Sequence, residues 1–207
     1  MYAGADIFKT APPVFSPGRR GMLEIILYIL AVAVPALILL YIAFIYNRFI
    51  TLKNAAESLL NQIRVALRKR MDLLAELVEA TKSYAKYERE TLESVTKLRT
   101  APLRGPAEIS RADAEAGRAF ANIIATLEAY PNLRASEPVV KTMEAASSVE
   151  DEIARLRYTY NSVIQQYNTL LEMFPSNLVA SALGFRKMEY LKMPKEVEER
   201  PSLAFEA

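Results

Sequence analysis

The stretch IILYILAVAVPALILLYIAFIY, residues 25–46, decides the broad class of this protein. It runs for 22 residues without a charged side chain. At about 1.5 Å per residue, a helix of this length measures roughly 33 Å, enough to cross a hydrocarbon core of about 30 Å. Tyr28, Tyr41 and Tyr46 lie toward its two ends, where aromatic rings favour the membrane interface. We therefore predict a single transmembrane helix at residues 22–46, anchored in the lipid bilayer.

The alternatives for this stretch are a buried core helix and a cleaved signal peptide. Core helices are seldom apolar on every side over such a length. Asn47, Arg48 and Phe49 follow the stretch and offer no small-residue cleavage site. Pro35 lies at its centre, and membrane helices tolerate proline there. The residues before it, 1–21, are rich in proline and glycine and are expected to form an irregular leader.

Composition excludes several kinds of chemistry. The 207 residues include no Cys and no His, which removes Cys–His and Ser–His–Asp catalysis and zinc sites built from those residues. Only 6 glycines are present, and no glycine-rich phosphate-binding motif occurs. A formal net charge of +2 argues against a nucleic-acid partner. We expect no enzyme activity, no cofactor and no metal site; the acidic run at residues 150–152 is expected to be a solvated helix face.

After the membrane stretch, apolar residues recur at alternating steps of three and four, which is typical of a coiled-coil seam. No Gly or Pro occurs between Asn47 and Thr100, so we predict one helix that continues from the membrane to about Thr100. The seam residues of this first helix are Ala56, Leu59, Ile63, Ala66, Arg70, Leu74, Leu77, Thr81, Tyr84, Glu88, Thr91, Val95 and Leu98.

Prolines and glycines divide the rest of the chain. They break it at residues 101–106 and 130–135, leaving a second helix at residues 107–129 and a third at residues 137–173. A short fourth helix is predicted at residues 177–183. The fold class is therefore all-α: a transmembrane helix continuing into a long antiparallel three- to four-helix bundle over residues 47–190, with a charged tail at residues 191–207.

The second helix is shorter than the third by about four turns. A simple up-down-up bundle would then leave apolar seam uncovered, from which we expect a homo-oligomer. Four small residues in the membrane stretch, Ala31, Ala33, Ala36 and Ala43, would also allow close helix contact in lipid.

Four charged residues occupy seam positions. Arg70 and Glu88 lie on the first seam, and Glu150 and Arg157 on the third. A lone charge in such a seam would cost several kcal/mol, so pairing between helices is expected. With parallel first and third helices, Arg157 is predicted to pair with Glu88, and Glu150 or Arg70 completes or flanks the network. Arg70 would lie lower, outside the helix overlap, and need another partner. We expect these charges to fix helix register.

The order and spacing of several segments resemble the LemA family. The segments are Tyr46-Asn47 directly after the membrane stretch, RKRMDLL at 68–74, YAKYERETL at 84–92, YPNL at 130–133, Tyr160-Asn161, Tyr167-Asn168 and FPSN at 174–177. The resemblance covers residues 46–190 and implies an N-terminally anchored antiparallel helical bundle. It implies no established reaction. A relative in magnetosome formation implies a membrane-organising role, and frequent neighbourhood with membrane proteases implies a partner role.

These observations predict a non-enzymatic, membrane-anchored scaffold that self-assembles and presents a helical surface. The alternative is an adaptor or sensor that regulates a partner membrane protein such as a protease. Lys9, Arg19 and Arg20 precede the membrane stretch, and three basic residues also lie in the twenty residues after it. Because Arg19 and Arg20 are adjacent and close to the membrane, we expect a cytoplasmic N-terminus and an extracytoplasmic bundle.

Overall fold

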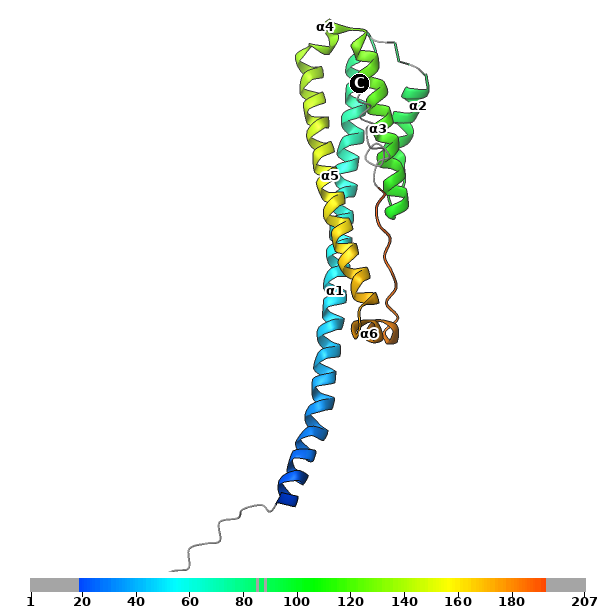
Figure 1. Ribbon diagram of the computed structural model, residues 1–207. Helices are drawn as coiled ribbons and strands as arrows, with labels where there is room; N and C mark the ends of the chain where they lie inside the picture. The colour runs from blue at the N-terminus through cyan, green and yellow to red at the C-terminus, as the bar shows by residue number, and fades with distance from the viewer. Residues whose placement is uncertain (1–18, 85, 88, 193–207) are drawn as a thin grey trace, which may run out of the picture. The chain divides into compact units, whose positions relative to one another are not determined.

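A computed structural model describes residues 19–84, 86–87 and 89–192. Its contacts divide the chain into two units, residues 1–45 and residues 46–207. Helix α1, Arg19–Thr81, contributes to both (Figure 1). Its apolar part near the N-terminus is long enough to span a membrane, and none of that part is buried. Helix α1 begins at Arg19, so the last three residues of the predicted leader, 19–21, are helical instead. Residues 1–18 lie outside the described residues.

The remaining elements are all helical. They are α2 (Arg89–Thr100), α3 (Pro106–Glu128), α4 (Pro131–Arg134), α5 (Glu137–Glu172) and α6 (Ser176–Ala182). The described part of the chain contains no strand, and the all-α prediction is confirmed. Gly105 and Pro106 begin α3, and Tyr130 precedes Pro131 at the next break, as the proline positions predicted.

The first soluble helix does not run to Thr100, as predicted, but ends at Thr81. The buried Thr81 hydroxyl donates to the Leu77 carbonyl and also contacts the Tyr87 hydroxyl, which holds the chain in a turn. Helix α2 then runs back along α1. Thr91, Val95 and Leu98 remain buried, because folding back places the same apolar face against the core from the opposite direction.

Side-chain contacts establish the direction of every helix in the bundle. Arg99 of α2 contacts Asp72 of α1, and Arg104 lies at the level of Arg64, so α2 descends as α1 ascends. Helix α3 ascends again, and α5 descends until Gln166 accepts a hydrogen bond from Arg48. The bundle is therefore up-down-up-down, with α1, α2, α3 and α5 as its helices (Figure 1). The expected parallel first and third helices correspond to α1 and α5, which are antiparallel.

The core lies where the apolar faces of these four helices meet. Seam residues of α1, among them Ala56, Ile63 and Leu74, are almost fully buried. Ala112, Ala116 and Ala119 of α3 are buried against them, and their small side chains bring α3 close to its neighbours. After α6 the chain turns at Gly184, whose φ of 73° favours glycine, and residues 185–192 extend back along α5. We call residues 185–192 the C-terminal strap.

Candidate functional site

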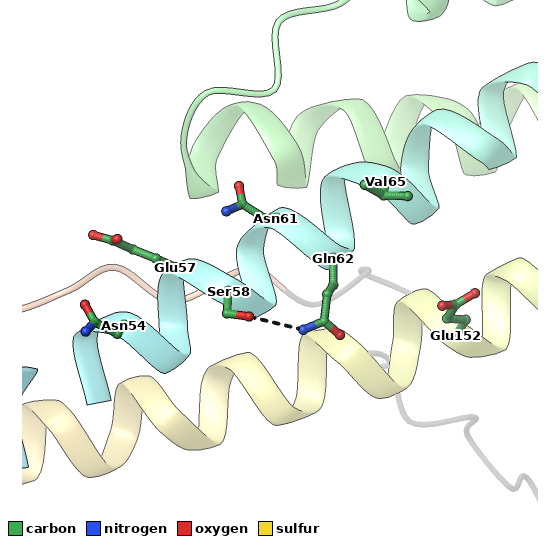
Figure 2. A pocket seen from close by; sticks show the side chains of 7 residues that line it. All are labelled: Asn54, Glu57, Ser58, Asn61, Gln62, Val65 and Glu152. Carbon is green, nitrogen blue, oxygen red and sulfur yellow. Dashed lines mark hydrogen bonds between the residues drawn. The ribbon is translucent and has the colours of Figure 1, made fainter. Parts of the chain in front are cut away.

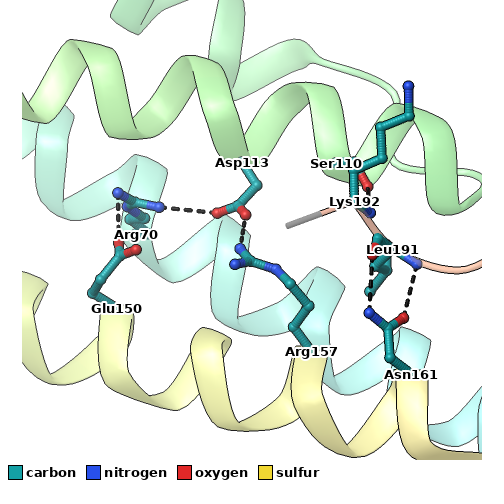
Figure 3. Close-up of polar contacts among 8 residues, drawn as sticks. All are labelled: Arg70, Ser110, Asp113, Glu150, Arg157, Asn161, Leu191 and Lys192. Atoms are coloured by element: carbon teal, nitrogen blue, oxygen red, sulfur yellow. Dashed lines mark hydrogen bonds and ion pairs between the residues drawn. The ribbon is translucent and has the colours of Figure 1, made fainter. Parts of the chain in front are cut away.

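A buried charge network lies at the centre of the bundle, where α1, α3 and α5 meet (Figure 3). The carboxylate of Asp113 on α3 receives a guanidinium on each oxygen. Nη1 of Arg70 lies 3.0 Å from Oδ1, and Nη2 of Arg157 contacts Oδ2. The three side chains are only 5%, 10% and 7% exposed for Arg70, Asp113 and Arg157. One carboxylate therefore joins three helices in a nearly dry environment.

Glu150 of α5 balances the remaining positive charge. Its Oε2 lies 2.5 Å from Nη2 of Arg70, so Arg70 bridges two carboxylates. Glu150 is 46% exposed and reaches into the network from the surface. Burial lowers the pKa of the Arg70 guanidinium, which its contact with Glu150 partly offsets. Burial also lowers the pKa of Arg157, and the positive charge of Arg70 adds to this shift. Two arginines and two acids together carry no net charge.

The structure brings together three of the four predicted seam charges. Arg70, Glu150 and Arg157 all belong to the network, and Arg70 lies within the helix overlap rather than below it. The expected heights were wrong because they assumed that α5 runs parallel to α1. Glu88 lies outside the described residues, so its predicted pairing with Arg157 stays a prediction. The carboxylate that Arg157 contacts belongs to Asp113.

Sequence reasoning missed Asp113, although a signal was present. Asp113 follows Ile109 by four residues and precedes Ala116 by three, so it lies on the buried face of α3. An acid at such a position needs a cationic partner. Two arginines on other seams supply it.

Two other basic residues of α1, Arg64 and Arg68, lie one turn apart and contact backbone carbonyls. Arg68 donates from Nη1 to the carbonyl of Arg99 and from Nη2, at 2.8 Å, to that of Ala101. Arg64 donates to the carbonyls of Leu103 and Arg104. The last carbonyls of a helix lack partners within it, and Arg68 satisfies that of Arg99 at the end of α2. Arg64 instead holds the segment between α2 and α3.

The C-terminal strap is held by two asparagines of α5. The Asn168 side chain donates to the Met188 carbonyl and accepts from the Met188 amide, both at 3.0 Å. Asn161 makes the same pair of bonds with Leu191, at 2.9 Å each. The hydroxyl of Tyr160 donates to the carbonyl of Glu189. Each asparagine side chain therefore bonds both the N–H and the C=O of one strap residue, as a neighbouring strand would. These bonds hold the extended strap against α5.

The strap covers the apolar surface that the sequence predicted to be free. Phe185 stacks on Phe49 of α1 with ring centroids 4.5 Å apart, and Leu191 is almost fully buried. Phe49, Leu52 and Ala56 are buried as well. The C-terminal strap therefore covers this part of α1 within the chain itself, and the expected homo-oligomer stays a prediction.

A shallow polar groove of about 600 Å³ lies between α1 and α5 (Figure 2). It is lined by Asn54, Glu57, Ser58, Asn61, Gln62, Val65 and Glu152. Gln62 donates a 3.4 Å hydrogen bond to the Ser58 hydroxyl. Three amides, two carboxylates and one hydroxyl line it, so the groove offers both hydrogen-bond donors and acceptors.

The arrangement is suited to holding helices in register. Each buried acid or base of the network is paired, so no proton-transfer group is left free at that place. Among residues 19–84, 86–87 and 89–192, no group of three or more acidic side chains is placed to hold a metal ion.

Comparison with known proteins agrees with this architecture. The sequence model described as "LemA family" matches residues 59–205. Magnetosome protein MamQ 2 of Paramagnetospirillum magneticum is 23% identical over 175 residues, which cover 71% of this chain and 64% of that protein. MamQ of Magnetospirillum gryphiswaldense is 24% identical over 205 residues, covering 84% and 75%. Protein LemA of Metamycoplasma hominis is 25% identical over 143 residues, covering 66% and 64%. The chain thus spans less than two thirds of the length of the first and the last of these.

Proposed function

This chain belongs to the LemA family, as its motifs predicted, and on that premise we propose that it is a membrane-anchored scaffold. In this role it self-assembles and presents the outer surface of its helical bundle to other molecules. The observation that carries the proposal is helix α1. One uninterrupted helix of 63 residues supplies both an unburied apolar stretch and the first helix of the bundle.

A scaffold needs a rigid body, and contacts inside the bundle hold its helices together. The network around Asp113 ties α1, α3 and α5 together, and it leaves their polar outer faces available. The polar groove between α1 and α5 is one such face. The relatives named as magnetosome proteins support a role connected with membranes, because those names belong to proteins that are similar to this chain over most of its length.

Two surfaces support self-assembly. The small residues of the membrane stretch, such as Ala36, permit helices to approach closely in lipid. At the far end of the bundle, a hollow of about 680 Å³ is lined by apolar and aromatic side chains, including Tyr84, Tyr130 and Leu133. Tyr84 is 70% exposed, which is a large aromatic surface left in water.

Disulfide cross-linking in native membranes tests self-assembly. The natural chain has no Cys, so a single introduced cysteine reports only its own contacts. We expect Ala36→Cys or Tyr84→Cys to give disulfide-linked dimers, and Val65→Cys to report whether the polar groove also lies between copies of the chain. Monomers at all three positions, together with co-purification of another membrane protein such as a protease, would instead support the adaptor function.

The Val65→Cys variant also tests orientation. We propose that the bundle is extracytoplasmic, because Arg19 and Arg20 lie immediately before the membrane stretch. Val65 is 71% exposed, so Val65→Cys should react with a membrane-impermeant maleimide in intact cells. Labelling that occurs only after the cells are broken would instead show that the bundle is cytoplasmic.

A further inference from the structure

Apolar side chains are exposed at the turn between α5 and α6. Phe174 is 78% exposed and Leu178 is 61% exposed; Met173 and Leu183 are about half exposed. Phe174 lies between the two helices, and Leu178 lies in the first turn of α6. Val179 and Ala180 on the other side of α6 are buried in the bundle. Residues 173–184 contain no charged side chain. We call these exposed residues, Met173, Phe174, Leu178 and Leu183, the α6 patch.

The α6 patch lies at the end of the bundle where the chain enters the membrane stretch. Arg48 contacts Gln166, and α5 continues to Glu172, roughly 9 Å farther toward that end. The ring of Phe185, just after α6, stacks on Phe49 and lies 6.1 Å from the ring of Tyr46. Tyr46 is the last residue of the apolar stretch. The patch is therefore tied to the residue where the chain leaves the lipid.

The turn holds these side chains in place. The Ser176 hydroxyl donates to the carbonyls of Leu170 and Met173, and the Asn177 amide donates to the Met173 carbonyl. Gly184, with positive φ, closes the turn, and the Phe185 amide donates to the Ala180 carbonyl. A turn with this much internal bonding keeps Phe174 and Leu178 outside the core.

Basic residues stand beside the α6 patch. Arg186 and Lys187 follow it in sequence, and both are exposed. Lys187 contacts Glu172, 2.5 Å away. Apolar side chains flanked by cations are the pattern of segments that lie in the headgroup region of a bilayer.

We propose that the α6 patch is a second membrane contact, which inserts Phe174 and Leu178 into the interfacial layer of the same bilayer that holds the anchor. The occupant of this surface is lipid. The position of the patch beside Tyr46 makes it continuous with the membrane interface, and the neighbouring Arg186 suits anionic headgroups. This membrane contact goes beyond the scaffold function and rests only on the anchor. The cross-linking experiment and the following test can therefore give negative results independently of each other.

Lipid quenching of tryptophan fluorescence tests the proposal on the full chain. The natural sequence has no Trp, so Phe174→Trp and Leu178→Trp each introduce a single reporter. The variants are reconstituted in vesicles of phosphatidylcholine and phosphatidylglycerol, with or without lipids brominated near the top of the acyl chain. Val65→Trp is the matched control, similarly exposed but about 28 Å along α1 from Tyr46. Circular dichroism verifies that each variant is folded.

We expect the two patch reporters to emit at shorter wavelength than Val65→Trp and to be quenched about twofold by brominated lipid, as for residues seated in the interface. The control should keep its emission in both kinds of vesicle. Emission from both patch reporters that matches the control would overturn the proposal. A blue shift without bromine quenching would also overturn it, because the patch would then be covered by protein, such as a second copy.

Discussion

Replacing Asp113 by asparagine should be among the most destabilising single changes in this bundle. The substituted side chain would keep the shape of the original but would lack the one carboxylate that two buried guanidiniums share. The network would change from no net charge to one positive charge. Glu150 would remain as the only acid, and it contacts Arg70 but not Arg157. Arg157 would then be buried without an anionic partner.

The structure sets the size of this effect. Breaking a buried ion pair by removing one partner costs about 3–5 kcal/mol. For a chain of this length, each kcal/mol lowers Tm by about 2–4 °C, so Asp113→Asn should lower Tm by roughly 6–20 °C. Glu150→Gln is the control. Glu150 is 46% exposed, so its ion pair is screened by solvent and its loss should cost about 1 kcal/mol or less.

Thermal unfolding of the full chain in detergent, followed by circular dichroism, measures both variants. The Arg157→Met substitution completes a double-mutant cycle with Asp113→Asn. Arg157→Met should cost less in the Asp113→Asn background than in the natural chain, because it then removes an uncompensated charge. The reasoning would be refuted if Asp113→Asn were no more destabilising than Glu150→Gln, or if the two substitutions were simply additive.

Three further predictions concern other parts of the bundle. Asn161→Ala and Asn168→Ala should each lower the free energy of unfolding by about 1–3 kcal/mol, because two backbone groups of the strap lose their partners. Limited proteolysis of either variant should cleave within residues 185–192, and an unchanged digest would contradict the docking role. Burial raises the pKa of Tyr160 and of Tyr167, so the unfolded chain releases these protons first as the pH increases. The contribution of these tyrosines to stability should be complete below about pH 10 and fall above it. In urea titrations, the stability of Tyr160→Phe and Tyr167→Phe should decline less steeply with pH than that of the natural chain. Arg68→Lys should increase hydrogen exchange at the C-terminal end of α2, since an ammonium cannot reproduce the two-pronged contact with the Arg99 and Ala101 carbonyls; exchange equal to that of the natural chain would show that the contact contributes little.

Local properties of the sequence determined the helices and most of their ends. The uncharged stretch at residues 25–46 predicts a membrane helix by length alone. Proline and glycine at residues 101–106 and at Pro131 and Gly184 remove backbone hydrogen bonds or permit positive φ, and breaks or turns occur at each of them. The spacing of apolar residues also identified most of the buried face of the long helices, because side chains three and four residues apart share a face whatever the tertiary arrangement. Tyr84, which the spacing placed on the seam, lies beyond the end of α1 and is 70% exposed.

Tertiary structure alone decided the direction of the helices and the partners of the charges. A pattern of threes and fours reads the same in both directions, so it did not reveal that the chain reverses after Thr81 and that α5 is antiparallel to α1. That reversal moved the heights of Glu150 and Arg157 and brought them to Arg70 and Asp113. The strap was likewise invisible in sequence, since its extended backbone is held by asparagines 20 and 30 residues earlier in the chain. Contacts over such separations depend on where helices meet in space, and no local preference encodes that.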